Sequence, residues 1–390
     1  MPSHADDILI AGAGIAGLSM AIALKLAGFS PIVFEREAKL EPIGAGLQLG
    51  PNATRLLAAW SVDLRQAACE PERLCFYNLR RGGAPLNHVP LGATARERYG
   101  APYTTILRAD LQEALLRRVT DLGVELAYDA PVSAVTTRAE GVEIEAAGTR
   151  YVGSALIGAD GLRSAVRGCV PGAGAPHNTG TTAWRAILPP HRLPEAFQHN
   201  NVGLWVGSGA HLVHYPVCSG QLLNAVFIVE TDWRTLSLAE DGATFLSERF
   251  MFAATEIRTL IDAADGWSVW PIWALNPLTS FYSGRVALAG DAAHAIVPFM
   301  ASGGSMAIED AAALAAALKR EKDVPAAFAL YDTARRQRLA RVAYRSLLMG
   351  RIYHFPDPGG LIRNAIIGAL SPQALLARND WLYRHDASAL

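Results

Sequence analysis

The stretch "DILIAGAGIAGLSMAIALKLAGFSPIVFERE", residues 7–37, decides the fold of this chain. Its apolar residues 8–11 predict a buried strand, and the glycine-rich turn after them leads into a predicted helix over residues 18–27. A second strand is predicted over residues 32–34. Strand, turn, helix and strand in this order predict a βαβ unit with a parallel sheet.

The turn carries a G-x-G-x-x-G pattern made by Gly12, Gly14 and Gly17. In a dinucleotide-binding unit such glycines allow a tight turn, a close approach of the backbone to a pyrophosphate, and close packing of the helix on the strand. The start of the helix offers free N–H groups to the phosphates. Glu35, which closes the second strand, is placed to accept hydrogen bonds from an adenosine ribose. The pattern predicts dinucleotide binding but does not separate NAD from FAD.

The composition is that of a globular protein with 390 residues, of which 51% are hydrophobic and 18% charged, enough for two or three core units. Thirty-five basic and 36 acidic residues leave a net charge of -1, so we expect a small-molecule partner and no nucleic acid or membrane. The four cysteines show neither a C-x-x-C pair nor metal-ligand spacing, so we expect no metal and no disulfide framework. The start lacks a basic leader segment and no apolar run reaches about 18 residues, so we expect a cytoplasmic protein.

Two further segments place an aspartate just after an apolar strand. Residues 155–157 precede Asp160, and residues 286–289 precede Gly290 and Asp291. The carboxyl ends of parallel strands are where open α/β sheets bind ligands. Either aspartate alone could equally be an ordinary helix cap. Together with the N-terminal fingerprint, they favour a ligand site at the edge of a sheet.

The three motifs together resemble the single-component FAD-dependent aromatic hydroxylases. These class A flavoprotein monooxygenases include salicylate hydroxylase, 3-hydroxybenzoate 6-hydroxylase and 6-hydroxynicotinate 3-monooxygenase. The resemblance selects FAD as the cofactor and covers nearly the whole chain. The segments that carry it are G-x-G-x-x-G with Glu35 and Arg36, "GADG" at 158–161, "GDAAH" at 290–294, "LRADL" at 107–111, "TAWRA" at 182–186, "MAIEDAAAL" at 306–314 and "DWLYRHDA" at 380–387.

Between residues 180 and 271 apolar and polar residues alternate in short runs at 182–188, 201–207, 210–217 and 222–230. Gly, Pro and Ser separate these runs, which predicts an antiparallel sheet with one covered face. The resemblance implies an α/β fold: a Rossmann-like FAD-binding domain, an interleaved antiparallel-sheet substrate domain and a C-terminal helical segment. The expected parts are 1–72, 101–178 and 273–345 for the FAD-binding domain, 73–100 and 179–272 for the substrate domain, and 346–390 for the helical segment.

The resemblance implies FAD-binding residues spread along the chain. Asp291 would hydrogen-bond a ribityl hydroxyl, and Arg108, on sequence alone equally a surface arginine, would bind the diphosphate. The helix that begins at Gly303 and Gly304 would point its N-terminus at the flavin edge that collects negative charge on reduction. Position 302 is Ser in this chain, whereas many relatives carry glutamine there. The full expected set is Gly12, Gly14, Ala16, Gly17, Glu35, Arg36, Gly46, Leu47, Arg108, Val132, Asp160, Asp291, Pro298, Gly303 and Gly304.

Arginines outside these motifs are given structural roles. Arg163 and Arg167 follow Asp160 and are expected to form salt bridges. An Arg-rich helix expected over residues 335–352 would keep its basic face in solvent or paired with the FAD-binding domain. A phospholipid-binding role for that face is the less favoured interpretation.

The expected substrate residues lie on a strand and on two loops. His211 and Tyr215 are four apart, so on a strand both side chains face the same way and can enter one cavity. The resemblance implies that His211, otherwise a structural histidine, is the general base for a substrate phenol and that Tyr215 orients it or relays the proton. Further substrate contacts are expected at Gln48, Arg185 and Phe299, of which Arg185 could instead form a salt bridge on the sheet.

The resemblance also implies the reaction. NADH or NADPH reduces FAD, O2 adds at flavin C4a to give a hydroperoxide, and an aromatic hydroxy acid or hydroxypyridine takes up the distal oxygen. The chain has no second G-x-G-x-x-G, so the nicotinamide cofactor would bind transiently in a surface groove. The expected partners are the aromatic substrate and O2, and the expected assembly is a monomer or homodimer. A flavin oxidase or dehydrogenase without oxygen insertion, and a non-catalytic redox sensor, stay open as alternatives.

Overall fold

The N-terminal fingerprint folds as the sequence predicts. In the computed structural model, which describes residues 6–39, 45–231, 234 and 242–389, strand β1 (Ile8–Ala11) leads into helix α1 (Ile15–Leu26) and then into strand β2 (Pro31–Phe34). Helix α1 begins at residue 15 rather than at the predicted residue 18, because Gly14 is its N-cap and Gly17 already lies inside the helix.

Strands β1 and β2 belong to a six-stranded sheet with the order β17-β18-β11-β1-β2-β7. Neighbouring strands pair parallel, except that β17 at the edge is antiparallel to β18. The carboxyl ends of β1, β11 and β18 therefore meet at one edge of the sheet, where α/β proteins bind ligands. The other four strands are β7 (Glu125–Ala127), β11 (Ala155–Gly158), β17 (Tyr282–Ser283) and β18 (Val286–Leu288).

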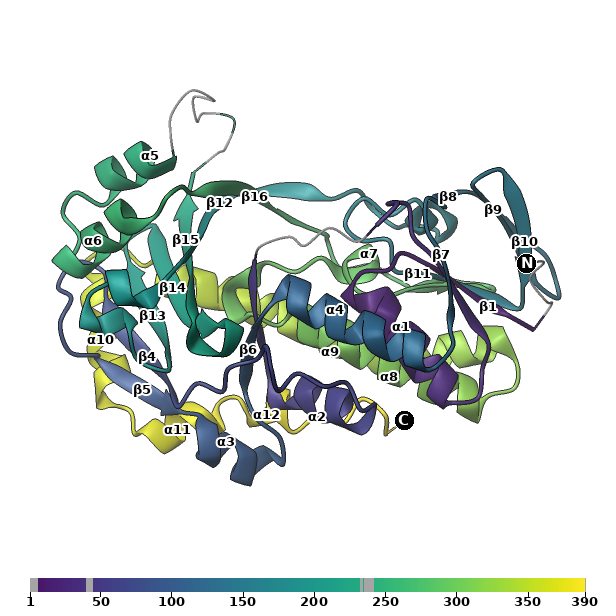
Figure 1. Cartoon of the computed structure of the whole chain (residues 1–390), viewed down its shortest axis with the longest axis horizontal. Coiled ribbons are helices and arrows are strands. Elements are labelled where there is room, and N and C mark those ends of the chain that lie inside the picture. The colour runs from purple at the N-terminus through teal and green to yellow at the C-terminus, as the bar shows by residue number, and fades with distance from the viewer. Residues whose placement is uncertain (1–5, 40–44, 232–233, 235–241, 390) are drawn as a thin grey trace.

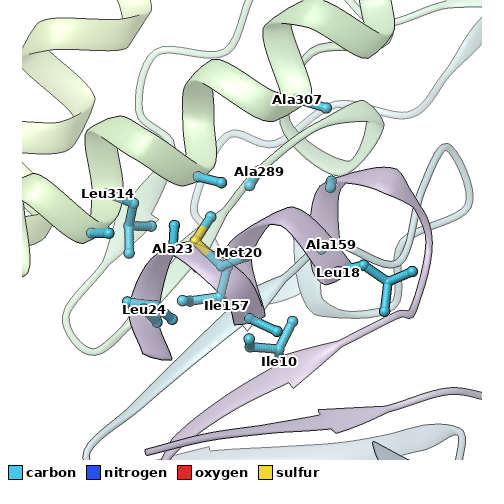
Figure 2. Packing of buried hydrophobic residues seen from close by; sticks show 14 of the residues in the cluster. Ile10, Leu18, Met20, Ala23, Leu24, Ile157, Ala159, Ala289, Ala307 and Leu314 are labelled. Atoms are coloured by element: carbon cyan, nitrogen blue, oxygen red, sulfur yellow. The ribbon is translucent and has the colours of Figure 1, made fainter. Parts of the chain in front are cut away.

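Helix α1 is buried along almost its whole length, because it packs between this sheet and helix α8 (Gly303–Arg320). Figure 2 shows the apolar side chains of the three elements in one cluster, among them Ile10, Met20, Ile157 and Leu314. A helix with apolar residues on every side is typical of such a buried position. The cluster fixes the starts of both helices close to the strand ends.

The second half of the molecule is built on a seven-stranded sheet with the order β16-β12-β15-β14-β13-β4-β5. The predicted runs 201–207, 210–217 and 222–230 match β13, β14 and β15 residue for residue. One pair departs from the expected antiparallel pattern, since β4 arrives from the first part of the chain and runs parallel to β13. The strands are β4 (Arg73–Asn78), β5 (Asn87–Pro90), β12 (His177–Leu188), β13 (Asn201–Gly207), β14 (Ala210–Val217), β15 (Leu222–Glu230) and β16 (Ser268–Ala274).

The expectation that this sheet has one covered face is wrong, because the central strands are buried on both faces. Helices α5 (Gly242–Arg249) and α6 (Thr255–Ala263) pack on one face around Trp184, Trp205 and Phe227. They lie at the outer end of the molecule in Figure 1. The opposite face is turned toward the six-stranded sheet and lines a cavity.

The Arg-rich helix is longer than predicted. Helix α9 (Val324–Tyr353) lies alongside α8 and ends beside the seven-stranded sheet (Figure 1). Its Arg335 is buried, with 1% of its surface exposed, and is paired with carboxylates of α8 rather than solvated. Arg335 is therefore paired with another helix instead of being solvated.

Smaller elements connect the two sheets. None of the helices in the described part of the chain is long and apolar enough to cross a membrane. The remaining strands are β3 (Gly46–Leu49), β6 (Thr104–Leu107), β8 (Val132–Thr137), β9 (Val142–Ala146) and β10 (Thr149–Gly153). The remaining α-helices are α2 (Pro51–Ala59), α3 (Gly92–Tyr99), α4 (Arg108–Asp121), α7 (Asp291–His294), α10 (Gly359–Ala369), α11 (Pro372–Ala377) and α12 (Asp380–Tyr383).

Candidate active site

One cavity of about 1580 Å³ lies between the strand ends of the six-stranded sheet and the inner face of the seven-stranded sheet. We call one side the nucleotide wall, which is formed by residues 11, 12, 14–16 and 159–161, Asp291 and the start of α8. We call the other side the sheet wall, which is formed by the cavity-facing side chains of β4 and β12–β15. The three motifs that are far apart in the sequence therefore meet at one cavity. Every residue predicted to bind cofactor or substrate lines it, except Gly17.

The glycines of the first turn have different surroundings. Gly12 has a φ of +99°, and a Cβ there would lie 2.6 Å from the carbonyl oxygen of Ala159, so only glycine fits. Gly17 lies behind the cavity, where a Cβ would lie 1.8 Å from the carbonyl oxygen of Gly12. Gly14 has no atom within 4 Å of its Cβ position, because that position faces the open cavity. Gly17 therefore serves the packing of helix on strand, and Gly14 keeps the wall open.

Glu35 is held by the backbone at the edge of the nucleotide wall. Its Oε2 accepts a hydrogen bond from the N–H of Ala13 at 2.7 Å, and its Oε1 accepts one from the N–H of Glu37 at 3.0 Å. Gln112 of α4, which the sequence analysis missed, lines the same region and donates from Nε2 to the carbonyl of Ala13 at 2.9 Å. These bonds fix the carboxylate beside the turn.

Asp160 is both a helix cap and a residue of the cavity, the two interpretations that the sequence left open. Its Oδ2 caps a short helical turn by accepting from the N–H groups of Ala165 at 2.8 Å and Val166 at 3.2 Å. Its Oδ1 is buried and has no hydrogen-bond partner among the described residues. A buried, unpaired carboxylate oxygen costs free energy unless a ligand supplies a donor.

Arg167 does not form the expected salt bridge with any residue that the structure describes. Its buried guanidinium donates to three carbonyl oxygens, those of Ala292 at 2.8 Å and of Gly161 and Asp291 at 3.2 Å each. Burial lowers the pKa of Arg167, and the nearby Asp160 and Asp291 oppose that shift. The arginine ties the two aspartate turns together and thereby sets their spacing along the cavity.

A buried charge cluster beneath the nucleotide wall holds the second aspartate turn. Asp310 accepts from the N–H of Gly290 at 2.9 Å, is 2.5 Å from Nε2 of His294, and accepts from Nε of Arg335 at 2.8 Å. Arg335 also donates to Glu309 at 2.6 Å. Burial opposes ionisation of Asp310, but His294 and Arg335 outweigh it and lower the pKa of the carboxyl. The cluster anchors Asp291 to α8 and α9.

Helix α8 begins without a side-chain cap. Ser302 is the N-cap residue, but its hydroxyl donates to the carbonyl of Met300 at 2.8 Å instead of accepting from the helix. Gly303 and Gly304 line the cavity, and a Cβ at Gly303 would meet no atom within 4 Å. The positive end of an 18-residue helix is therefore open to a ligand.

The nucleotide wall fits a bound FAD. It offers two uncapped helix starts, a glycine cradle and the unpaired Oδ1 of Asp160 on one cavity. Free N–H groups suit the phosphates and the electron-rich edge of a flavin, and acidic side chains suit hydroxyl groups. The other predicted FAD residues on this cavity are Ala16, Arg36, Gly46, Leu47, Arg108, Val132 and Pro298.

The sheet wall presents side chains rather than backbone. The strand register places Arg185 opposite Val226, which is opposite Val213, so these side chains form one row across the sheet. His211 and Tyr215 lie two residues on either side of Val213 and face the same way. Both line the cavity, as predicted.

His211 does not stand alone on this wall. Its Nδ1 is 2.7 Å from Nε2 of His354, whose Nδ1 is 2.8 Å from Oε1 of Glu230. Burial and then the His354 ring lower the pKa of His211 well below its usual 6.5. His354 follows α9, 143 residues away in sequence, and the sequence analysis missed it. The imidazole of His211 is therefore neutral at neutral pH.

Tyr215 and Gln48 form a second polar group in the cavity. Burial raises the pKa of Tyr215, while Arg185 and a hydrogen bond with Gln48 oppose the shift. The hydroxyl of Tyr103, also missed from sequence, donates to Oε1 of Gln48 at 2.6 Å. Tyr215 is thus a neutral hydroxyl that can donate or accept a hydrogen bond.

Arg185 has no carboxylate partner among the residues that the structure describes, so the expected alternative of a sheet salt bridge is wrong for that part of the chain. Its Nε is buried without a hydrogen bond, and its guanidinium lies 5.9 Å from the ring centre of Trp270. Burial lowers the pKa of Arg185, but an arginine stays charged under ordinary conditions. No carboxylate of the described residues therefore balances this cation on the sheet wall.

The remaining residues complete the sheet side of the cavity. The Phe299 ring lies 5.7 Å from His211 and 5.9 Å from His354, and Tyr353 lies 5.5 Å from His211. His214 points to the opposite face, where it is buried near Phe197. His211 is therefore surrounded by the rings of Phe299, Tyr353 and His354.

Comparison with known proteins identifies the family. Residues 6–346 match the family described as FAD binding domain. The chain is 37% identical over 387 residues to 3-hydroxybenzoate 6-hydroxylase 1 of Aquipseudomonas alcaligenes, with 97% of each chain covered. It is 33% identical to 3-amino-4-hydroxybenzoate 2-monooxygenase PtnB3 of Streptomyces platensis, covering 99% of this chain and 98% of that one. HpxO of Klebsiella pneumoniae complexed with FAD and uric acid has a TM-score of 0.86 and 26% identity, covering 96% of this chain and 95% of that one.

These likenesses extend over both walls of the cavity rather than over the nucleotide turn alone. The relatives are named as hydroxylases and monooxygenases, so an oxidase or dehydrogenase without oxygen insertion and a non-catalytic sensor are not favoured. The chain belongs to the FAD binding domain family and is an FAD-dependent aromatic hydroxylase that uses NAD(P)H.

Proposed function

We propose that this enzyme hydroxylates a single-ring aromatic acid that carries a phenolic hydroxyl. The observation that carries the proposal is the pairing, on one face of one sheet, of the neutral imidazole of His211 with the unpaired guanidinium of Arg185. An imidazole suits a hydroxyl that must lose its proton, and a guanidinium suits a carboxylate. In this proposal residues 73–100 and 179–272 form the substrate domain around that site.

The nucleotide wall would hold FAD through backbone groups and a few side chains. The start of α1 would face the diphosphate together with Arg108, Glu35 would face the adenosine ribose, and Asp291 a ribityl hydroxyl. The start of α8 would face the flavin edge. FAD, once reduced by NAD(P)H, supplies the oxygen atom that it takes from O2.

His211 would accept the phenolic proton at Nε2. Its Nδ1 is already engaged with His354, and Nε2 has no hydrogen-bond partner among the described residues, while the ring lines the cavity. A phenolate donates electrons into its ring better than a phenol does, so removing the proton activates the ring for hydroxylation. Tyr215, held by Gln48, would orient the same oxygen atom. A positioned base contributes about 10²–10⁴ in rate.

Arg185 would bind the acidic substituent. A buried cation without a partner costs free energy, and a substrate carboxylate removes that cost by forming charge-assisted hydrogen bonds. The hydroxylated benzoates in the names of the relatives combine a hydroxyl with a carboxylate, which supports this class of substrate. Phe299 would lie near the substrate ring, on the His211 side of the cavity.

The test compares matched ligands on the FAD-loaded enzyme. We expect oxygen-dependent NADH or NADPH consumption and a product heavier by one oxygen atom with hydroxybenzoates such as 3-hydroxybenzoate. Benzoate, which lacks the hydroxyl, should give no hydroxylated product. The His211→Ala variant should be slower by about 10²–10⁴. His214→Gln is the matched control, because His214 is buried on the same strand but faces away from the cavity.

Two outcomes contradict the proposal. Equal product from benzoate and 3-hydroxybenzoate excludes a need for a phenolic proton. A His211→Ala variant as fast as the parent excludes His211 as the base.

A further inference from the structure

We propose that His354 and Glu230 connect His211 to solvent as a path for the proton that leaves the substrate. This inference rests on the proposed role of His211 as the base. It goes beyond that role because it names how the proton leaves a buried site. It assigns His354 and Glu230 as positioning residues, since neither lines the cavity.

The geometry provides a continuous chain of three groups. His211 Nδ1 and His354 Nε2 are 2.7 Å apart, and His354 Nδ1 and Glu230 Oε1 are 2.8 Å apart. Both distances are those of ordinary hydrogen bonds. His211 and His354 are 1% and 5% exposed, whereas the Glu230 side chain is 58% exposed. The chain therefore leads from a buried base to the protein surface.

The carboxylate fixes which ring nitrogens carry hydrogen. A Glu230 carboxylate only accepts, so Nδ1 of His354 donates to it and Nε2 of His354 is left with its lone pair. That lone pair accepts from Nδ1–H of His211, which leaves Nε2 of His211 as an acceptor toward the cavity. Glu230 thus acts on the base through His354, as the carboxylate does in a Ser-His-Asp triad.

Transfer along this chain balances. The substrate O–H bond breaks and an N–H bond forms at Nε2 of His211. The proton on Nδ1 of His211 moves to Nε2 of His354, and the proton on Nδ1 of His354 moves to Glu230 and then to water. One proton reaches solvent, and the His211 Nε2–H then donates to the phenolate oxygen. When the product oxygen takes up a proton, the same steps run in reverse.

The surroundings oppose storage of charge on the path. The charged groups that face His354 are Glu230, Arg249 of α5 and Arg363 of α10. Burial lowers the pKa of His354, and Glu230 opposes that shift. The backbone holds the two partners in place, because Gly209 donates to the carbonyl of His354 and accepts from the N–H of Glu230. A histidine that does not stay protonated passes a proton on instead of holding it.

The experiment follows the proton without any turnover. The oxidised, FAD-loaded enzyme is mixed with 3-hydroxy-4-nitrobenzoate in weak buffer at mildly acidic pH, with no NAD(P)H present. Absorbance reports phenolate formation on the enzyme, and a pH-indicator dye reports proton release to solvent. We expect both signals to appear together in the parent, with one proton released for each phenolate formed.

The variants separate the links of the path. The glutamine in His354→Gln keeps hydrogen-bonding groups but cannot pass a proton from one side to the other. We therefore expect proton release to slow about tenfold or more. Glu230→Gln changes only the exposed end and should slow release by a smaller factor. Added imidazole should restore release in His354→Ala, and His214→Gln should behave as the parent. FAD content and circular dichroism check that each variant folds.

The outcomes distinguish this inference from the proposed function. If His211→Gln forms the phenolate as fast as the parent, the base assignment itself fails. If His211→Gln is slow but His354→Gln and Glu230→Gln match the parent, the base stands and the path is overturned. The path is also overturned if a folded His354→Ala variant releases the proton slowly and added imidazole does not restore the rate. A purely structural defect would then explain the loss.

Discussion

The two walls of the cavity are built in opposite ways. The nucleotide wall is mostly backbone, with two uncapped helix starts and a Gly12 that no other residue can replace. The sheet wall consists of side chains, among them His211, Tyr215 and Arg185, that stand on regular strands. Backbone N–H and C=O groups stay in place whichever residue carries them, whereas a single substitution changes a side chain. The nucleotide wall therefore suits a cofactor shared by the family, and the sheet wall suits the choice of substrate.

The supports of the two walls differ as well. Beneath the nucleotide wall, Asp310 and Arg335 belong to a buried ionic cluster. Its other members are Asn52 of α2, His294 of α7, Glu309 of α8 and Arg338 of α9. Behind the sheet wall lies an apolar cluster that contains Trp184 and Trp205. A buried ionic cluster is strongly destabilised by the loss of one member, whereas an apolar cluster under a strand tolerates changes on the cavity side. Substitutions in the ionic cluster beneath the nucleotide wall should thus affect folding and FAD binding together.

The largest effect is expected from Gly17→Ala. Alanine favours a helix, yet its Cβ would lie 1.8 Å from the carbonyl oxygen of Gly12, so α1 must move away from β1. We expect a loss of more than about 3 kcal/mol in the free energy of unfolding, with little or no FAD retained. Thermal unfolding and the flavin absorbance of the purified protein measure both.

Gly14→Ala is the matched control for that change. Its Cβ would meet no protein atom within 4 Å, so the fold should stay stable while FAD binding weakens. If the two variants lose the same amount of stability, the distinction between a packing glycine and a cavity glycine is wrong.

The contrast between the walls also explains what the sequence could predict. The nucleotide turn and the strand that ends before Asp291 are local patterns, so their positions could be read from neighbouring residues. The strands 201–207, 210–217 and 222–230 were predictable because alternation and turn residues mark their ends. That alternation also placed His211 and Tyr215 on one face.

Contacts between distant segments could not be predicted in this way. His354 stands in a loop after a helix, and nothing near it in sequence indicates that it meets His211 across 143 residues. Arg335 lies on a helix rich in arginine, and its burial depends on the carboxylates that α8 presents. The role of Arg167 depends on the distance between two turns that only the folded sheet brings together. Such pairings follow from topology rather than from local patterns.

Arg185→Met sharpens the view that the sheet wall selects the substrate. The variant keeps an unbranched apolar stem but removes the cation, and hydrogen bonds to charged groups contribute about 1.5–3 kcal/mol. We therefore expect the KM for 3-hydroxybenzoate to rise about 10- to 150-fold. The KM for 3-hydroxybenzamide, which has no negative charge, should change little.

The affinity for FAD provides the second control for Arg185→Met. Arg185 stands on β12 in the sheet wall, so FAD titration of the apoprotein should give the parent value. An equal rise in KM for the acid and the amide would contradict the proposed contact with a carboxylate. A loss of FAD affinity would contradict the division of labour between the walls.

The smallest expected effect is that of mild acid on kcat/KM. A histidine with the ordinary pKa of 6.5 keeps only about a quarter of its neutral form at pH 6. Burial and His354 lower the pKa of His211 well below that value, so the base is present above the lowered pKa and is lost only as pH falls through it. Between pH 8 and pH 6 we expect kcat/KM for 3-hydroxybenzoate to fall by less than about twofold.

The substrate does not titrate in this window, because a benzoate carboxyl ionises below it and a phenol, like the tyrosine side chain near pH 10, above it. Recovery of the full rate on return from pH 6 to pH 8 separates protonation from unfolding. A decline centred at 6.5 would show that water reaches His211 and that its burial on the sheet wall does not shift its proton affinity. A flat profile instead means that the sheet wall works with a neutral base beside a permanent cation.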